Sequence, residues 1–366
     1  SQSRLWVGTE KGLNRQLSHQ DDFVRYMHNP ESPSSLVDDH VTDILEDHDN
    51  NIWVATKSAV HRYNDETDSF NRYTFYNENS GKNAEINWFL SIDKRLYVGT
   101  DSGLFAYRVG SESFYRYTEQ HGLPQGDREI FAGGLDNQGI LWVAIQDAGL
   151  FQHASGQDLF IENKTLNRKL LTSKDVQISV ITSPDGFDDL WLGTVSHGLY
   201  RYNPGSEELI QVEQSNKNPA STFTHSEITD IFSDQSGLIW VSTRLAGIFQ
   251  WSQHTLNIEH IGAIEQNDSE QYRTSYIWYF HQTRPDEVWV GSQRGLALFN
   301  PKTLSYDRLD LAPQQYLTQP EIYWIESRDD ELWLATDIGI LKYDMKLNSV
   351  DFIREPVSDT NQYYAI

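Results

Sequence analysis

The sequence predicts an all-β fold, a β-propeller built from four-stranded antiparallel blades. A five-residue phrase of aliphatic, aromatic, aliphatic, small and usually threonine residues occurs eight times, at spacings of 44 to 49 residues. A period of about 40–50 residues with several short strands in each unit is typical of a propeller blade. No stretch shows a long amphipathic helical period, which also favours an all-β chain. The copies begin at Leu5, Ile52, Leu96, Leu141, Leu190, Ile239, Val288 and Leu332.

The composition supports a large packed core and excludes several classes of partner and site. Of the 366 residues, 38% are hydrophobic and 13% are aromatic, which argues against disorder and suits packing between sheets. The formal net charge of -24 would repel phosphates and anionic lipid, so neither nucleic acid nor membrane insertion is expected. The chain has no cysteine, which excludes disulfides, thiolate metal sites and thiol nucleophiles.

The repeat around Ile239 shows the strands expected of one blade. The turn Asp234–Gly237 supplies the side-chain capping and the positive φ that tight hairpins need. A second turn ends at Gly247, and Gly recurs there in seven of the eight copies, with Ala59 in the other. The four strands are predicted at Ile228–Phe232, Leu238–Thr243, Ile248–Trp251 and Ile258–Ile261.

The two ends of the sequence predict how the blades are completed. The chain starts at a second strand, Leu5–Gly8, and ends at a lone first strand, Tyr363–Ile366. Pairing of these segments would close the propeller with eight blades and leave no bare sheet edge. The alternative is a ring of seven blades. Residues 1–366 are expected to be one propeller domain, cut from a longer membrane receptor, because the sequence opens inside a repeat and shows neither a signal peptide nor a membrane span.

The phrase and the residues that follow it resemble the two-component regulator propeller repeat. The closest copies are Leu5–Arg15, Leu96–Tyr107 and Leu190–Asn203, each with Gly-Leu after the phrase. The Asp-x-x-Gly turn at Asp136–Gly139 and the segment His121–Pro124 also match the repeat. The resemblance covers essentially the whole chain, although the family often has seven blades in each ring.

The resemblance implies a function outside enzyme catalysis. Similar propellers are periplasmic sensor halves of bacterial inner-membrane receptors in two-component signal transduction. Their cytoplasmic halves are histidine kinases, hybrid histidine kinases or diguanylate cyclases, and characterised members sense oligosaccharides. The resemblance therefore implies a periplasmic ligand-sensing domain that forms a homodimer in the intact receptor, with the output activity outside this chain.

A polar residue precedes most of the predicted first strands, and we call these the strand-start residues. Carboxylates brought together there could hold sugar hydroxyls, an amine or a cation. No cofactor is expected, and the alternative is a bound Ca²⁺ ion. The competing interpretation is that acidic residues simply lie in solvent at strand ends. The strand-start residues are His40, Glu85, Glu129, Gln177, Glu227, Tyr276, Glu321 and Gln362.

Aromatic side chains and three longer loops extend this candidate site. Trp88, Trp278, Tyr323 and Trp324 lie in first strands and could stack on a sugar ring, although packing between blades is the competing interpretation. The second turns at Ile145–Gly149, Thr194–Gly198 and Thr243–Gly247 carry one extra residue and contain Gln146, Asp147, His197 and Arg244. These loops could form one wall of the site only if they lie on the same face as the glutamates.

The sequence is also compatible with two functions other than ligand sensing. A propeller lyase or glycoside hydrolase could place an acid and a base from different blades, such as His40 with Glu85. No nucleophile elbow, His-Glu-x-x-His motif or phosphate loop is present, so no catalytic residue is predicted. A protein-docking platform is the second alternative, because many repeat proteins bind other proteins.

Overall fold

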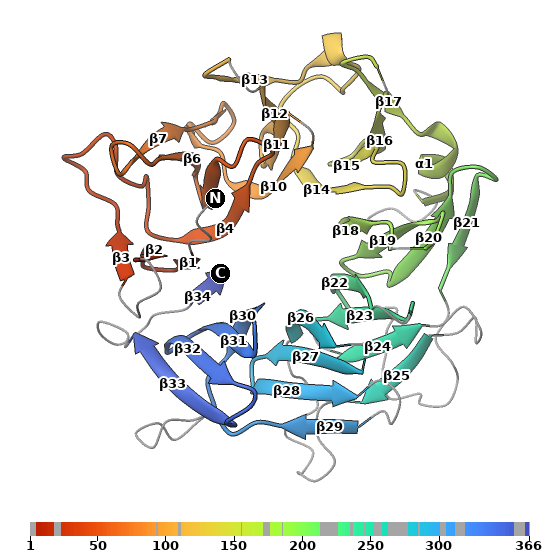
Figure 1. Ribbon diagram of the computed structural model, residues 1–366. Helices are drawn as coiled ribbons and strands as arrows, with labels where there is room; N and C mark the ends of the chain where they lie inside the picture. Colours follow the sequence, from red (N-terminus) through yellow and green to blue (C-terminus); the bar gives the residue numbers. More distant parts are fainter. Residues whose placement is uncertain are drawn as a thin grey trace. The chain divides into compact units, whose positions relative to one another are not determined.

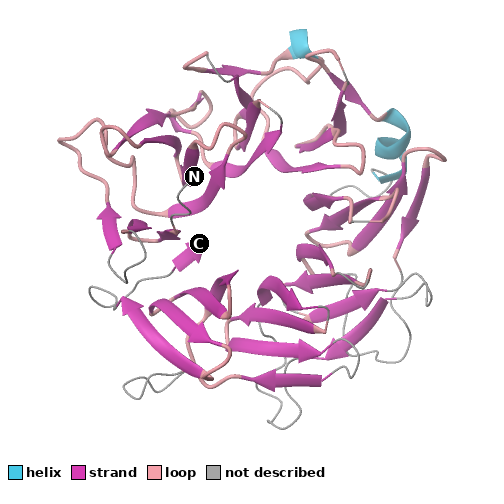
Figure 2. Cartoon of the chain, viewed as in Figure 1, coloured by secondary structure: helices cyan, strands magenta, loops and turns pink. Residues whose placement is uncertain are grey.

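The computed structural model describes residues 5–17, 23–92, 94–108, 111–154, 156–170, 176–184, 186–212, 226–234, 237–244, 246–251, 258–262, 277–284, 286–300, 305–311, 319–354 and 363–365. These residues form an all-β fold of eight four-stranded antiparallel sheets (Figures 1 and 2). The chain is an eight-bladed β-propeller, as predicted, and the alternative of seven blades is wrong.

Each blade runs from a first strand to a fourth strand in chain order, except for the blade that combines the two ends of the chain. That blade contains β34 (Tyr363–Ala365), β1 (Trp6–Thr9), β2 (Gly12–Gln16) and β3 (Phe23–Tyr26). The next three contain β4 (Val41–Glu46), β5 (Ile52–Thr56), β6 (Ala59–Asn64) and β7 (Ser69–Tyr73); β10 (Ile86–Ile92), β11 (Arg95–Thr100), β12 (Gly103–Arg108) and β13 (Phe114–Arg116); and β14 (Ile130–Leu135), β15 (Leu141–Ile145), β16 (Gly149–His153) and β17 (Phe160–Glu162).

The other four blades repeat the same order of strands. They contain β18 (Ile178–Thr182), β19 (Leu190–Thr194), β20 (Leu199–Asn203) and β21 (Glu208–Gln211); β22 (Ile228–Ser233), β23 (Ile239–Thr243), β24 (Ile248–Trp251) and β25 (Ile258–Gly262); β26 (Ile277–Arg284), β27 (Glu287–Ser292), β28 (Gly295–Asn300) and β29 (Ser305–Arg308); and β30 (Ile322–Arg328), β31 (Glu331–Thr336), β32 (Gly339–Asp344) and β33 (Ser349–Arg354). Every first strand begins at the residue predicted for it.

Three small elements were not predicted from the sequence. They are the two-stranded hairpin of β8 (Tyr76–Asn77) and β9 (Lys82–Asn83), the 3-10 helix Glu119–His121, and α1 (Lys164–Leu170). Helix α1 has seven residues, too few to establish a hydrophobic period in the sequence. It begins where the Asn163 side chain accepts a hydrogen bond from the Leu166 N–H at 2.9 Å.

The C-terminal strand pairs with the N-terminal blade. β34 is antiparallel to β1, with Ala365 opposite Gly8 and Tyr363 opposite Thr9. The sheet therefore has the order β3-β2-β1-β34, which places a C-terminal strand in the first-strand position of this blade.

The chain divides into two compact units. One contains residues 1–116, 289–298 and 307–366, and the other contains residues 117–288 and 299–306. Within each unit, the first strands of successive blades lie beside one another (Figure 1). In the first unit these are β30, β34, β4 and β10, and in the second they are β14, β18, β22 and β26. A single domain over residues 1–366 stays a prediction.

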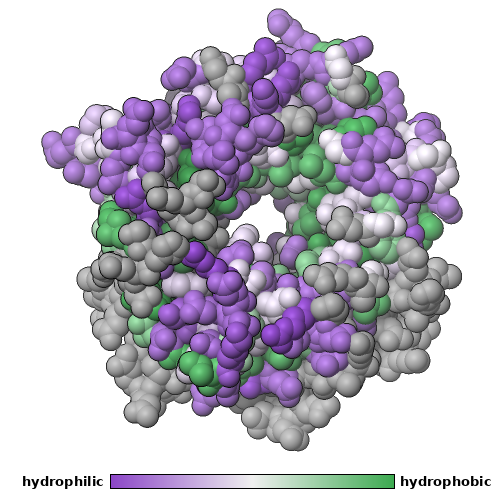
Figure 3. All heavy atoms as spheres, in the orientation of Figure 1, coloured by the Kyte–Doolittle hydropathy of each residue, from purple (hydrophilic) through white to green (hydrophobic). Residues whose placement is uncertain are grey.

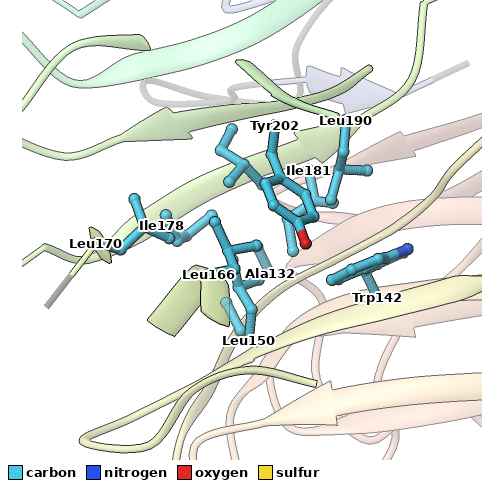
Figure 4. Close-up of a cluster of buried hydrophobic side chains, with 11 residues drawn as sticks. Ala132, Trp142, Leu150, Leu166, Leu170, Ile178, Ile181, Leu190 and Tyr202 are labelled. Carbon is cyan, nitrogen blue, oxygen red and sulfur yellow. The ribbon is translucent and has the colours of Figure 1, made fainter. Parts of the chain in front are cut away.

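The repeated aromatic residue fills the core of every blade. All eight of these side chains are buried, and Trp53, Trp191 and Trp240 have no exposed surface. Figure 4 shows Trp142 beside Tyr202, close to Leu150 and Leu166 of one core cluster. In contrast, most described side chains on the face drawn in Figure 3 are hydrophilic, in agreement with the charge of the chain.

The small residue of the phrase is explained by contact between neighbouring blades. A Cβ atom on Gly193 would lie 2.7 Å from Cγ2 of Ile228, the first residue of the next first strand. Gly8 meets Val41 in the same way, with a Cβ-to-Cγ1 distance of 2.5 Å. The phrase therefore encodes both the core aromatic and the close approach of the following blade.

Candidate functional site at the start of the first strands

A repeated backbone contact fixes the strand-start residues. In six blades the carbonyl oxygen of this residue accepts a hydrogen bond from the N–H of the residue that directly follows the second strand, over 2.9–3.3 Å. The contact uses no side chain, so the strand-start side chains are left to vary. The six residues are His40, Glu85, Glu129, Gln177, Glu227 and Glu321, whereas Tyr276 and Gln362 lie outside the described residues.

A β-bulge follows each of these contacts. The pairing of the first and second strands shifts between the first and third residues of the first strand in the same six blades, for example between Ile322 and Trp324. A bulge re-aims the side chains beside it and is frequent next to functional sites. In these six blades, the bulge and the backbone contact give the strand-start residue the same backbone geometry, whereas its side chain differs from blade to blade.

In the first unit, Glu321 belongs to a small hydrogen-bonded group. Its Oε2 accepts a hydrogen bond from the Tyr323 hydroxyl at 2.8 Å, and its N–H donates to Oδ1 of Asp337 at 2.8 Å. Burial, followed by the negative charge of Glu321, raises the pKa of Asp337 to about 6. Tyr323 is itself buried, so this group combines an acidic pair with an ordered phenol at one end of β30.

The first unit has two other described strand-start residues, Glu85 and His40. Glu85 forms an ion pair with Lys57 at 3.3 Å, and both side chains are more than half exposed. Such an exposed pair contributes little to stability. The His40 N–H donates to Oδ1 of Asp38 at 3.0 Å, and the residue is half-buried.

In the second unit, the longer loops lie against the strand-start residues. Arg244 donates through its N–H to the Glu227 carbonyl at 2.9 Å and through Nη1 to Glu227 Oε2 at 2.8 Å. Gln146 contacts Glu129 in the same way through its N–H, also at 2.9 Å. These loops therefore lie at the same end of the blades as Glu129 and Glu227, as a shared binding site requires.

The loop that contains His197 is held at the same end. Val195 donates its N–H to the Gln177 carbonyl at 3.0 Å. The His197 N–H donates to Thr194 Oγ1 at 2.8 Å, and its Nδ1 lies 3.0 Å from Ser196 Oγ. These contacts order the loop and place an imidazole on it.

The aromatic residues of the first strands are half-buried or buried. Trp88 lies across Gly99 on the paired strand, where a Cβ atom would come within 2.2 Å of its Nε1. Trp324 packs against the core cluster that contains Val7 and Trp333, and Trp278 is half-buried. Packing accounts for these positions, and sugar stacking on their remaining surface stays a prediction.

Two aspartates at the third position of first strands were not identified from the sequence. Burial raises the pKa of Asp43 to about 7 and that of Asp230 to about 6. Each carboxylate accepts a 2.8 Å hydrogen bond from the backbone N–H of the following residue. This hydrogen bond lowers the pKa, but by less than burial raises it. The signal was the triplet Thr-Asp-Ile in both strands, since aspartate is depleted from strand interiors.

The described residues contain no group of three or more His, Asp or Glu side chains arranged to hold a metal ion. Bound Ca²⁺ therefore stays an untested alternative. Within the same residues, no helix combines the length and apolar composition required to cross a membrane.

Comparisons with known proteins agree with this architecture. Residues 35–58, which include β4 and β5, match the family described as two component regulator propeller. The extracellular domain of the hybrid two component system BT3049 from B. thetaiotaomicron is 16% identical, with a TM-score of 0.51, over 100% of this chain and 57% of that one. No curated protein matches the sequence.

Other propellers are similar in fold as well. The Dos1 propeller is 10% identical with a TM-score of 0.59, over 93% of this chain and 94% of that chain. The dihydro-heme d1 dehydrogenase NirN is 10% identical with a TM-score of 0.65, over 99% and 74%. This chain spans 57–65% of the length of the first three structures that it matches. The family match covers residues 35–58, and the five-residue phrase that this segment contains occurs eight times along the chain, so the repeats are similar to those of the two component regulator propeller family.

Proposed function

We propose that this propeller is the extracytoplasmic ligand-sensing domain of a bacterial signalling receptor. The ligand, a small polar molecule such as an oligosaccharide, binds at the ends of the blades where the first strands start. One observation carries the proposal: the same backbone contact and bulge recur in six blades, but the side chains that they present differ in charge and shape. A constant frame with variable side chains suits recognition, as on other rigid scaffolds with binding loops.

The group around Glu321 supplies chemistry suited to a sugar. The carboxylates of Glu321 and Asp337 can accept hydrogen bonds from hydroxyl groups, and the Tyr323 phenol holds Glu321 in place. Lys57 and Arg244 place donors beside Glu85 and Glu227. At each of these positions, a paired donor and acceptor rejects analogues that leave them unpaired, and this is the source of specificity.

The extracellular domain of the B. thetaiotaomicron system supports the location and the type of receptor. Its description places a propeller of this fold in the extracellular part of a hybrid two component system. By this analogy the present chain belongs to a membrane receptor, pairs with a second copy there, and leaves kinase or cyclase chemistry to another part. A ligand acts by favouring one of two receptor arrangements over the other.

A thermal-shift screen with plant and algal oligosaccharides tests the proposal. A ligand that binds only the folded chain raises the melting temperature in a concentration-dependent way. Glu321→Gln is expected to weaken binding about tenfold or more, because a hydrogen bond to a charged group contributes about 1.5–3 kcal/mol. Glu66→Gln makes the same charge change in an exposed hairpin at the other end of a blade and is the matched control. A shift that survives Glu321→Gln, Glu85→Gln and Glu227→Gln unchanged would contradict this location.

The raised pKa of Asp43 favours a lyase or glycoside hydrolase as the second candidate. A carboxyl with a pKa of about 7 can serve as a general acid near neutral pH. In that case the screened sugar would be cleaved, and Asp43→Asn would abolish cleavage while the melting-temperature shift persisted. Detection of intact sugar in every supernatant would exclude this candidate for the sugars tested.

A further inference from the structure

An aspartate in the first turn of three blades accepts a hydrogen bond from the core tryptophan. Nε1 of Trp53, Trp142 and Trp240 donates to Oδ2 of Asp47, Asp136 and Asp234, respectively, over 2.8–2.9 Å. The aspartate always lies two residues beyond the residue that pairs with the tryptophan. A buried indole N–H is thereby satisfied by a carboxylate, as burial of a polar group requires.

The blade of β30–β33 has the tryptophan but a cation in place of that aspartate. Trp333 pairs with Glu326, so the equivalent position is occupied by Arg328. Trp333 is 4% exposed, and its buried Nε1 has no hydrogen-bond partner among the described residues. The hairpin is also tight, because Arg328 pairs directly with Glu331.

A cavity lies beside the side chains of Trp333 and Arg328. Trp333 and Arg328 both line it, with Gln16 and Lys342, and its volume is about 460 Å³. Lys342 Nζ lies 5.8 Å from the centroid of the Trp333 ring. The cavity therefore combines a buried donor that needs an acceptor with three cationic side chains, Arg328, Lys342 and Lys346, and its lining also contains four acidic residues.

Three of the four acidic residues that line this cavity have partners, and the fourth is Asp329. Glu331 pairs with Lys342 at 3.6 Å, and Asp330 pairs with Lys346. Asp344 accepts hydrogen bonds from the N–H groups of the hairpin that it begins. Arg328 has no such partner among the described residues, so its guanidinium is available to an anion.

We propose that this cavity binds the carboxylate of a small-molecule ligand. One carboxylate oxygen accepts the hydrogen bond from Trp333 Nε1, and the guanidinium of Arg328 neutralises the charge, because Arg is suited to bidentate contact with carboxylates. The ligand carboxylate thus takes the place of Asp47, Asp136 or Asp234 in the other blades. The cavity lies at the end of β30 opposite Glu321, so this site is separate from the one at the strand starts and independent of it.

The indole N–H resonance of Trp333 in ¹H–¹⁵N spectra of the full chain tests this proposal. The probes are acetate, succinate and glucuronate, compared at constant ionic strength with acetamide, succinamide and glucose. We expect a saturable downfield shift with at least one carboxylate and none with its neutral counterpart. Trp333→Phe identifies the resonance by its loss, and the Trp53 indole, which already donates to Asp47, is the internal control.

Two substitutions of Arg328 separate binding from stability. Arg328→Gln should weaken carboxylate binding by about tenfold or more, whereas Arg284→Gln, at the end of a different first strand, should leave it unchanged. Arg328→Asp introduces the carboxylate found at this position in three other blades, so it should shift the Trp333 resonance without ligand and abolish binding. Equal shifts with the carboxylates and their neutral counterparts, or no saturable shift with any probe, would overturn the proposal.

Discussion

At the residue scale, the aspartate that recurs in the first turn of three blades has a structural role. Asp136 accepts hydrogen bonds from the N–H groups of Gln138 and Ile140 and from Trp142 Nε1, all at 2.9 Å. A single carboxylate therefore orders the turn and satisfies the buried indole. The spacing of six residues between this aspartate and its tryptophan is visible in the sequence, but the hydrogen bond became evident only from the folded turn.

Replacement of Asp136 should measure this double role. Asp136→Ala is expected to lower the free energy of unfolding by about 2–4 kcal/mol, because three donors lose a charged acceptor and one of them is buried. Asp136→Asn, which keeps one oxygen, should fall between the wild type and Asp136→Ala. Urea unfolding followed by tryptophan fluorescence gives the values, and a loss below about 0.5 kcal/mol for Asp136→Ala would contradict the role.

The buried His61 is expected to make the folded chain less stable in acid. It is fully buried, with Nε2 accepting from the Val37 N–H at 2.9 Å and Nδ1 3.2 Å from the Val54 carbonyl, so the ring is neutral. Burial lowers its pKa to about 4, below the usual value of 6.5. Stability from this group is therefore complete above about pH 6.5 and falls by up to about 3 kcal/mol as the pH decreases through 4.

Urea unfolding between about pH 7 and pH 4 checks this dependence. His61→Gln should be less stable at neutral pH but should lose less stability than the wild type as the pH falls over this range, since the amide does not titrate. His48→Gln, at an exposed imidazole, is the matched control and should keep the wild-type slope. Parallel profiles for wild type and His61→Gln would rule out His61 as the source.

At the element scale, the close approach of neighbouring blades depends on the small residue of the phrase. Gly193→Val is expected to destabilise the chain by about 1–3 kcal/mol, because the added atoms overlap Ile228. Ile228→Ala in the same chain should recover part of this loss. Gly205→Ala, whose new Cβ would meet only Asn203 Oδ1 at 3.3 Å, is the control. Strictly additive effects of the two substitutions in a double-mutant cycle would show that they do not interact.

The elements also show what the sequence could predict. The phrase and its turns located all eight first strands, because core burial and hairpin chemistry are both encoded locally. Helix α1 was not predicted because its seven residues are too few to show a helical hydrophobic period. The strand-start residues were placed at one end of each blade by counting along the strands. In contrast, the raised pKa of Asp43 and the substitution of Arg328 for the turn aspartate depend on burial and pairing register, which a sequence pattern does not report.

At the scale of the whole molecule, the pairing of β34 with β1 joins the two ends of the chain in one sheet. Deletion of residues 361–366 should lower the melting temperature and increase self-association, because the buried strand β1 would then expose an unpaired edge. Differential scanning calorimetry and light scattering measure the two effects. Deletion of residues 1–3, which precede β1, is the control, and equal behaviour of the two shortened chains would contradict a stabilising role for β34.

The backbone contacts of the strand-start residues have a consequence for how new specificity can arise. Each of these residues is held to the neighbouring turn by a hydrogen bond to its backbone carbonyl oxygen. Replacing the side chain therefore leaves this hydrogen bond intact. A library randomised at positions 85, 129, 227 and 321 should therefore yield mostly folded members that differ in what they recognise. The same chain could serve as a template for biosensors, in which selection changes the analyte while the scaffold is inherited unaltered.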